Sequence, residues 1–399
     1  MVESLSPHTQ AWLSCHGNSV VSGLQAVVLA EWKQHQDILV QSRAGTGKST
    51  SIGMLLNEES VTQGISVICL PTAALCIEMK NVLTELLSSP LFLVRVMADG
   101  IQGTTILSGL TPYRHVILIT EPRHIRVHLA LLRGCRIFSL FFDEADALFD
   151  GNHLVDCQGI LAACLRSDTK TMFLSATFPP YIVTRIEESL AFADPDRCES
   201  PYHIRLCSSI TTNSETNAVV PHIRKLFTVI PALDSKGIIS RLIAEIFARS
   251  ACRILVFGGS RKLVSDIHGS LSKRNIPVCI IKDSLDDYSH ADVIMDPKGV
   301  LSRGLNIPKL SVGISIGLPE SKETLLHQWG RIARAPLTQG EFFHFVTPDE
   351  VEQLNYLSFQ LGITFEVYKP AVDKRHPFEI HTSTADRYNQ VLALVRRVS

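Results

Sequence analysis

Short apolar runs recur along this chain, and each is followed by a polar turn and then by a helix-like stretch. In the first half these runs cover residues 37–40, 65–70, 115–120, 135–142 and 171–174. Apolar runs of this length that alternate with helical segments predict βαβ units and a parallel sheet. In such sheets the chemistry lies at the carboxyl ends of the strands, where the polar turns of this chain also fall.

The alternation is interrupted once and then resumes. Residues 208–221 are polar and lack apolar periodicity, which predicts a linker. Beyond the linker, apolar runs cover residues 253–258, 277–281, 292–295, 310–316 and 341–346. We therefore predict an N-terminal α/β domain over residues 1–207, the linker over 208–221, a second α/β domain over 222–370, and a short C-terminal tail over 371–399.

The charge balance limits how such a chain can hold nucleic acid. Lys and Arg total 38 against 39 acidic residues, so the formal net charge is −1. This balance excludes a generic polycation, and a phosphate backbone must be held by local groups in a cleft. The apolar content of 45% argues against a disordered chain.

The spacing of the cysteines and the N-terminal residues indicate the cellular compartment. The chain has 10 cysteines and no Cys-x-x-Cys pair, which argues against a zinc site and favours a reducing environment. Residues 1–17 lack a basic and an apolar region of the kind found in signal peptides, and the first arginine is Arg43. No stretch has the length needed to cross a bilayer. We expect a soluble intracellular protein, cytoplasmic or nuclear.

The strongest local motif is Ser-Arg-Ala-Gly-Thr-Gly-Lys-Ser at residues 42–49, between a strand-like run and a helix-like run. Glycines allow consecutive backbone N–H groups to curl around phosphates, and the helix N-terminus that follows favours an anion. Lys48 is expected to reach the β and γ phosphates, and the Ser49 hydroxyl to bind Mg²⁺. The alternative, an ordinary Gly-rich turn, is disfavoured by the strand–turn–helix context.

A second motif, Asp143-Glu144-Ala145-Asp146, follows the apolar run that ends at residue 142. Acids at the end of a buried strand are costly unless a cation or another partner is present. We expect Asp143 to hold Mg²⁺ and Glu144 to orient the attacking water. The alternative is a helix N-terminus that carries acidic residues, which is common.

These motifs, followed by Ser175-Ala176-Thr177, resemble motifs I, II and III of the DEAD-box RNA helicases. Residues 302–306 resemble motif V, and residues 327–334 resemble motif VI. Gln25 lies 23 residues before Lys48, where this family has its adenine-reading glutamine. The resemblance spans residues 16–348.

The resemblance implies two tandem RecA-like domains, each a mainly parallel sheet flanked by helices. It implies an ATP- and Mg²⁺-dependent RNA helicase or RNP remodeller, with RNA-stimulated ATP hydrolysis between the two domains. Its expected partners are single-stranded or structured RNA and RNP proteins, and the expected state is a monomer. The alternative is a catalytically weak scaffold or RNA clamp. The DEAD tetrad and Gln25 disfavour a third possibility, a DNA-directed translocase.

The resemblance also assigns roles to individual residues. The implied catalytic residues are Lys48, Asp143, Glu144, Arg331 and Arg334, the two arginines acting as arginine fingers. The implied metal ligands are Ser49 and Asp143. The implied nucleotide-binding residues are Gln25, Gly45, Thr46, Gly47, Lys48, Ser49, Thr50, Gly304 and Asn306. The residues expected to couple the site to domain closure are Ser175, Thr177 and His327, although His327 equally fits a structural histidine. The implied RNA-binding residues are Pro71, Thr72, Arg123 and Arg303.

The departures from the family pattern lie mostly on the RNA side. Ala73 stands where motif Ia has an arginine, and Glu121 stands where motif Ib has a proline. Residues 281–295 are shorter than usual, motif V lacks its Thr-Asp pair, and Gln328 replaces the first arginine of motif VI. In the adenine pocket, Asn18 replaces an aromatic residue and Val21 a proline. The residues implied to touch phosphate and metal are mostly kept, whereas many implied to touch RNA are not.

Overall fold

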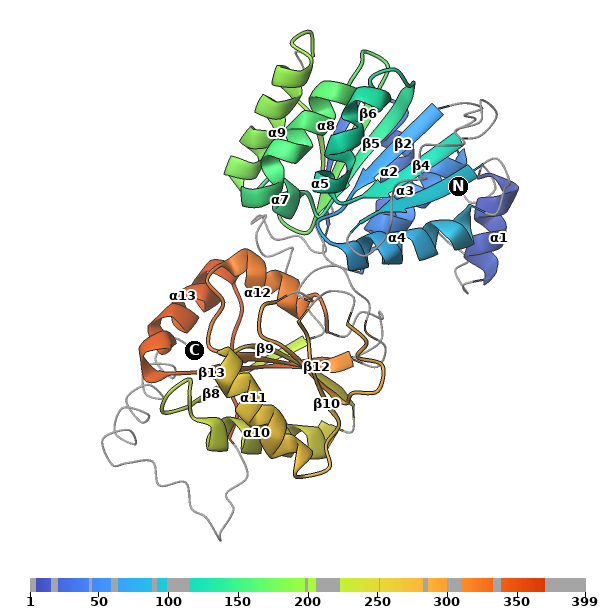
Figure 1. The fold of residues 1–399 in the computed structure, drawn as a ribbon. Coiled ribbons are helices and arrows are strands. Elements are labelled where there is room, and N and C mark those ends of the chain that lie inside the picture. Colours follow the sequence, from blue (N-terminus) through green and yellow to red (C-terminus); the bar gives the residue numbers. More distant parts are fainter. Residues whose placement is uncertain are drawn as a thin grey trace. The chain divides into compact units, whose positions relative to one another are not determined.

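The computed structural model describes residues 5–15, 21–42, 45–58, 64–87, 92–98, 115–197, 200–205, 223–250, 252–282, 286–299, 301, 307, 310–332 and 339–369. By internal contacts the chain divides into two compact units, unit 1 over Met1–Ile210 and unit 2 over Thr211–Ser399 (Figure 1). The division falls within the segment that the sequence predicts as a linker.

Unit 1 contains a seven-stranded sheet in the order β3-β4-β2-β5-β6-β1-β7, and every pair of neighbouring strands is parallel. Its strands are β1 (Asp37–Gln41), β2 (Gly64–Cys69), β3 (Phe92–Met97), β4 (His115–Thr120), β5 (Ile137–Asp143), β6 (Lys170–Ser175) and β7 (Tyr202–Arg205). The central strands are buried along nearly their whole length, as parallel strands covered on both faces must be.

Helices cover both faces of this sheet. One layer is formed by α2 (Gly23–Glu31), α3 (Lys48–Glu58) and α4 (Ala73–Leu86), with α1 (Pro7–Cys15) packed on α3 and α4. The other is formed by α5 (Pro122–Ile125), η2 (Arg126–His128), α6 (Leu129–Leu132), α7 (Ala145–Leu148), η3 (Gly151–His153), α8 (Leu154–Cys164) and α9 (Pro180–Ala193). Alternate residues of β1 pack against the two helix layers: Ile38 and Val40 contact the first layer, and Leu39 contacts the second.

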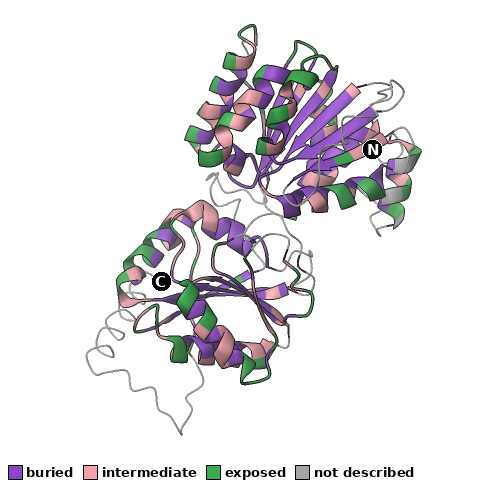
Figure 2. Cartoon of the chain, viewed as in Figure 1, coloured by how far each residue is buried: buried purple, intermediate pink, exposed green. Residues whose placement is uncertain are grey.

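Unit 2 repeats the architecture with a parallel sheet in the order β10-β11-β9-β12-β13-β8-β14. Its strands are β8 (Ile223–Val229), β9 (Arg253–Gly258), β10 (Val278–Ile280), β11 (Val293–Asp296), β12 (Leu310–Ile316), β13 (Gly340–Val346) and β14 (Glu366–Val367). One layer is formed by α10 (Lys236–Ser250) and α11 (Arg261–Ser272), the other by α12 (Lys322–Trp329), η6 (Pro348–Glu350) and α13 (Val351–Leu361). Figure 2 shows buried strands in each unit and helices exposed on their outer sides.

The predicted α/β class with two mainly parallel sheets is confirmed. All ten predicted apolar runs lie on strands, with ends that differ by up to two residues. Four strands were not predicted: β3, β7, β8 and β14. The linker residues 208–221 and the tail 371–399 lie outside the described residues. Within the described part of the chain, no helix combines the length and the apolar character needed to span a membrane.

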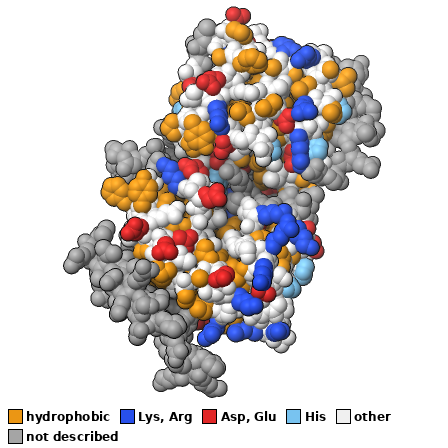
Figure 3. All heavy atoms as spheres, turned by 60° about the vertical axis from the view of Figure 1, so that its left-hand side comes forward, with side chains coloured by type: hydrophobic (Ala, Val, Ile, Leu, Met, Phe, Trp, Pro, Cys, Tyr) orange, Lys and Arg blue, Asp and Glu red, His pale blue; other side chains and the backbone are white. Residues whose placement is uncertain are grey.

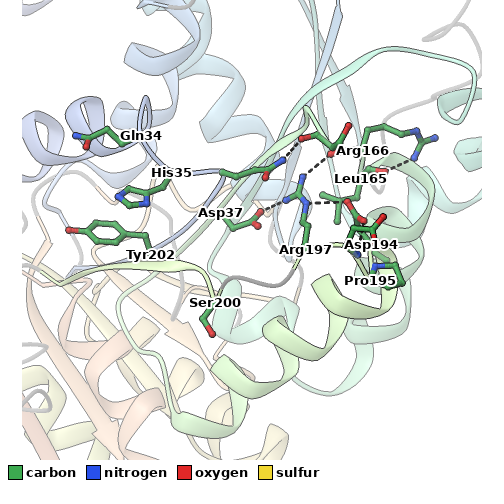
Figure 4. Close-up of a pocket in the computed structure, with 14 residues that line it drawn as sticks. Gln34, His35, Asp37, Leu165, Arg166, Asp194, Pro195, Arg197, Ser200 and Tyr202 are labelled. Atoms are coloured by element: carbon green, nitrogen blue, oxygen red, sulfur yellow. Dashed lines mark hydrogen bonds and ion pairs between the residues drawn. The ribbon is translucent and has the colours of Figure 1, made fainter.

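A polar pocket of about 760 Å³ lies in unit 1 at the amino end of β1 (Figure 4). Arg197 is nearly buried there and lies between Asp37, with which it forms an ion pair, and Asp194 at 3.5 Å. The rings of His35 and Tyr202 stack at a centroid distance of 3.9 Å. Because the pocket lies where the chain enters β1, it is at the opposite edge of the sheet from the turn that follows β1.

Candidate functional site

The predicted phosphate loop connects the end of β1 to the start of α3. The N–H of Ser42 donates to the Ser175 carbonyl at the end of β6 (3.1 Å), and the Ser42 and Thr46 hydroxyls share a hydrogen bond of 2.6 Å. Gly45 and Gly47 have φ angles of 78° and 89°, in the region that favours glycine. The loop is therefore tied to the neighbouring strand and turns tightly into α3.

Lys48, the first residue of α3, is 8% exposed. Its Nζ donates a hydrogen bond of 2.5 Å to the Ser42 carbonyl, across the loop. A nearly buried ammonium group needs such oxygen partners. The contact holds the charge of Lys48 inside the loop, where the motif predicts that phosphates bind.

The predicted metal ligands are in direct contact. Asp143 is the last residue of β5, and its Oδ2 accepts a hydrogen bond of 2.9 Å from the Ser49 hydroxyl. Burial and the neighbouring charge of Glu144 raise the pKa of Asp143, while Lys48 and the Ser49 hydroxyl act in the opposite direction. A hydroxyl and a carboxylate at this separation form the oxygen donor set that suits Mg²⁺, so the residues present fit the metal.

Glu144 has an unusual backbone conformation. Its φ and ψ are 56° and 49°, the left-handed region, which costs an ordinary residue about 1–2 kcal/mol. Its N–H donates to Asp143 Oδ1 at 3.0 Å, and its side chain makes no capping hydrogen bond to the short helix α7. Helix capping therefore does not account for this glutamate. Strain of this kind is concentrated at functional sites.

The predicted coupling residues Ser175 and Thr177 connect the ends of two strands. The N–H of Thr177 donates to Ser175 Oγ at 3.1 Å, and the Thr177 hydroxyl donates to Asp146 Oδ2 at 2.9 Å. All three side chains are buried. Asp146 belongs to the Asp-Glu-Ala-Asp motif but is not among the predicted site residues. Its place in that motif is the sequence feature that could have identified it, since its partner Thr177 lies 31 residues away.

Gln25 packs against the phosphate loop. It is 7% exposed, and its Oε1 accepts from the N–H of Ser22 at 2.9 Å in a capping box at the start of α2. A Cβ atom placed on Gly47 would lie 2.7 Å from Gln25 Nε2. Gln25 is thus brought to the predicted nucleotide site, where its contact with adenine stays a prediction.

The predicted RNA-binding residues of unit 1 lie at the same edge of the sheet. Pro71 and Thr72 follow β2, which pairs with β5, and Arg123 follows β4 on the other side of β2. Thr72 caps α4 through a 3.4 Å hydrogen bond from the Leu75 N–H, and Ala73 is 3% exposed. The side chain of Arg123 is 52% exposed and contacts Glu121 at 3.3 Å.

Two of the predicted site residues of unit 2 lie on or directly after α12. His327 and Arg331 are 1% and 2% exposed, and Arg331 Nε donates to the His327 carbonyl at 3.3 Å. This position leaves both the functional and the structural interpretations of His327 open. Arg303, Gly304, Asn306 and Arg334 lie outside the described residues, as do Asn18 and the rest of residues 16–20.

Comparison with known proteins agrees with this geometry. The DEAD/DEAH box helicase family model matches residues 22–186. The chain is 25% identical over 361 residues to a DEAD-box ATP-dependent RNA helicase CshA of Geobacillus kaustophilus, covering 87% of this chain and 73% of that protein. It is 24% identical to the CshA of Bacillus cereus, covering 83% of this chain and 62% of the relative.

Solved structures share the fold. S. cerevisiae Dbp5 bound to RNA and ADP BeF3 matches with a TM-score of 0.74 and 17% identity, over 99% of this chain and 98% of that one. Mss116p bound to ssRNA and AMP-PNP matches with a TM-score of 0.73 and 16% identity, over 98% and 80%. The matched family model covers residues 22–186, where the phosphate loop, the acids after β5 and the Ser175–Thr177 turn lie, so this part of the chain is similar to the DEAD/DEAH box helicases.

Proposed function

We propose that the chain is an ATP- and Mg²⁺-dependent RNA helicase or RNP remodeller whose ATP hydrolysis is stimulated by RNA. The observation that carries this proposal is the contact between the end of β5 and the phosphate loop. Ser49 and Asp143 meet there, beside the charge of Lys48. The named relatives, DEAD-box ATP-dependent RNA helicases, support the reaction class.

Each group of the site has a defined task in this reaction. The loop N–H groups and Lys48 hold the phosphates, which places the γ phosphate next to the acids. Mg²⁺ held by Ser49 and Asp143 would neutralise phosphate charge. Glu144 orients the attacking water, and its left-handed backbone conformation sets the direction in which its side chain leaves the main chain. The nucleotide contacts of Thr50, Gly304, Asn306, Arg331 and Arg334 stay predictions from the motifs.

RNA is the proposed second substrate, held through its backbone with little sequence preference. Pro71, Thr72 and Arg123 lie at the edge of the sheet that also carries the phosphate loop, so RNA and nucleotide would bind to neighbouring strand ends. Charge on the described surface is mixed, since both basic and acidic side chains lie on the face shown in Figure 3. Local groups must therefore supply the grip on RNA. We further propose an intracellular monomer, cytoplasmic or nuclear, that works with RNP proteins.

The site assignment is tested by Lys48→Ala. Loss of the buried ammonium should weaken ATP binding at least tenfold, because the phosphates lose their principal cation. Binding of a fluorescent ATP analogue to the full chain measures this, with circular dichroism to show that the variant folds. Unchanged binding and turnover would place the nucleotide elsewhere.

A second candidate function is a scaffold or RNA clamp with little catalysis. Two observations favour it: the buried Ala73 replaces the motif Ia arginine, and Arg123 is engaged by Glu121. The two functions differ in one measurement, because a clamp binds ATP and RNA without multiple turnover. Steady-state hydrolysis therefore distinguishes them.

A further inference from the structure

Glu121 is a buried acid at the carboxyl end of β4. It is 3% exposed, and its backbone takes part in three hydrogen bonds. Its N–H donates to the Met97 carbonyl (3.1 Å), and its own carbonyl accepts from the His124 N–H (3.0 Å) and from the Thr120 hydroxyl (2.8 Å). The backbone at Glu121 is therefore fixed, and the burial of its side chain restricts where the carboxylate can lie.

The two oxygens of this carboxylate contact two basic side chains. Glu121 Oε1 lies 3.3 Å from Arg123 Nη2, and Glu121 Oε2 lies 3.5 Å from His124 Nε2. The acid side chain is only 4% exposed, whereas Arg123 and His124 are 52% and 31% exposed. The half-exposed guanidinium of Arg123 thus lies next to a buried carboxylate and compensates part of its charge.

This cluster lies among the residues that the proposed function assigns to RNA. β4 runs between β3 and β2, and Pro71 and Thr72 follow β2. A phosphate that approaches Arg123 therefore finds a guanidinium already next to a carboxylate. If Arg123 pairs fully with the phosphate, it must move away from Glu121. The buried charge of Glu121 is then less well compensated.

Resting on the proposed RNA-binding function, we propose that Glu121 acts as an internal substitute for an RNA phosphate, so that the chain binds RNA weakly and releases it readily. Glu121 is a positioning residue in this scheme, since it acts through Arg123 and His124. The net charge that the cluster presents to RNA is reduced, and fewer counterions are released on binding. Glu121, which stands where motif Ib has a proline, then lowers the affinity for RNA without abolishing RNA binding.

The test compares Glu121→Gln with the wild type as full chains. Affinity for a labelled single-stranded oligoribonucleotide is measured by fluorescence anisotropy over a series of salt concentrations. Removing the charge while keeping the shape should tighten binding about three- to tenfold. It should also steepen the slope of log K against log salt by up to about 0.7, the value of one additional phosphate contact on a single strand. The control is Asp150→Asn, which removes the charge of the acid directly before η3 that pairs with Arg185 of α9 (2.9 Å), and it should leave both quantities unchanged.

A second arm separates this role from a structural one. Arg123→Ala should weaken RNA binding less than twofold in the wild type but remove the whole gain in the Glu121→Gln background. This measurement also tests the inference if Glu121→Gln fails to fold. A tenfold loss of RNA affinity in Arg123→Ala alone would show that Arg123 binds RNA strongly despite Glu121, which contradicts the inference. Equal affinity and slope for wild type and Glu121→Gln would overturn the inference and leave the proposed function standing. Absence of RNA binding in both proteins would instead overturn the proposed function itself.

Discussion

The hydroxyl of Ser49 donates a 2.9 Å hydrogen bond to Asp143 Oδ2, which joins two residues separated by 94 positions in the sequence. The contact exists because β1 and β5 are parallel strands of one sheet, and their carboxyl ends meet at one edge. It brings together a hydroxyl and a carboxylate that can share a metal ion.

Ser49→Ala removes one of the two proposed metal ligands. It should reduce the enhancement of ATP binding by Mg²⁺ at least tenfold, with little change in the affinity measured in EDTA, because only the metal-dependent part of binding is lost. Titrations of a fluorescent ATP analogue with and without Mg²⁺ measure the two affinities. Ser51→Ala, which removes a buried hydroxyl of the same helix that bonds the Gly47 carbonyl, should keep the Mg²⁺ enhancement. Equal enhancement in wild type and Ser49→Ala would remove Ser49 from the metal site.

Thr177→Val breaks the hydrogen bond to Asp146. The buried carboxylate loses an O–H donor, so the free energy of unfolding should fall by about 1–3 kcal/mol, as measured by urea denaturation. If the pair also couples RNA to the nucleotide site, the ratio of RNA-stimulated to basal hydrolysis should fall severalfold. Thr184→Val removes an exposed hydroxyl that bonds the Pro180 carbonyl on α9, and it should change neither quantity. A destabilised variant with full RNA stimulation would assign Thr177 a structural role only.

His115 predicts a dependence of stability on pH. Its Nε2 shares a 2.8 Å hydrogen bond with the Ser66 hydroxyl, and burial lowers the pKa of His115 to about 4 from 6.5. Between these values the unfolded chain binds a proton that the folded chain does not. The contribution is therefore fully present above pH 6.5 and is lost as the pH falls toward 4. From pH 7 to pH 5 it should cost about 2 kcal/mol of unfolding free energy.

Urea denaturation of wild type and His115→Asn at pH 7 and pH 5 measures this contribution. The variant does not titrate at this position, so its loss of stability between the two pH values should be smaller by that amount. The buried His344 of unit 2, whose pKa is also lowered by burial, is retained in both proteins and does not affect the difference between them. An identical pH dependence in the two proteins would contradict the assignment of the titration to His115.

The sequence predicted the strands that lie on the clearest apolar runs, and it missed four others. The apolar run of β3 is interrupted by Arg95, and β8 begins close to the polar linker with the charged residues Arg224 and Lys225. The phosphate loop and the acids after β5 were predictable, since their motifs are contiguous in the sequence. Arg123 and His124 lie within three residues of Glu121 in the sequence, so their pairing with it was also foreseeable. The burial of Glu121 was not, because it depends on the position of β4 between two other strands, which no local pattern encodes.

The contact of Gln25 with the phosphate loop illustrates the same limit. Its spacing from Lys48 predicted that it belongs to the nucleotide site. That its amide lies where a Cβ atom of residue 47 would be is a property of how α2 and α3 pack. Sequence spacing identified the members of the site, whereas tertiary packing decides which of them touch.

In the proposed function, Glu144 orients the water for an RNA-stimulated ATP hydrolysis at this site. The most direct measurement is steady-state ATP hydrolysis by the full chain, with and without single-stranded RNA, for the wild type and Glu144→Gln. We predict RNA-stimulated turnover in the wild type, and a loss of about 100-fold or more in Glu144→Gln with ATP binding retained. Glu188→Gln, an exposed glutamate on α9, should behave as the wild type. Wild-type turnover in Glu144→Gln, or ATP binding without any hydrolysis by the wild type, would contradict the account.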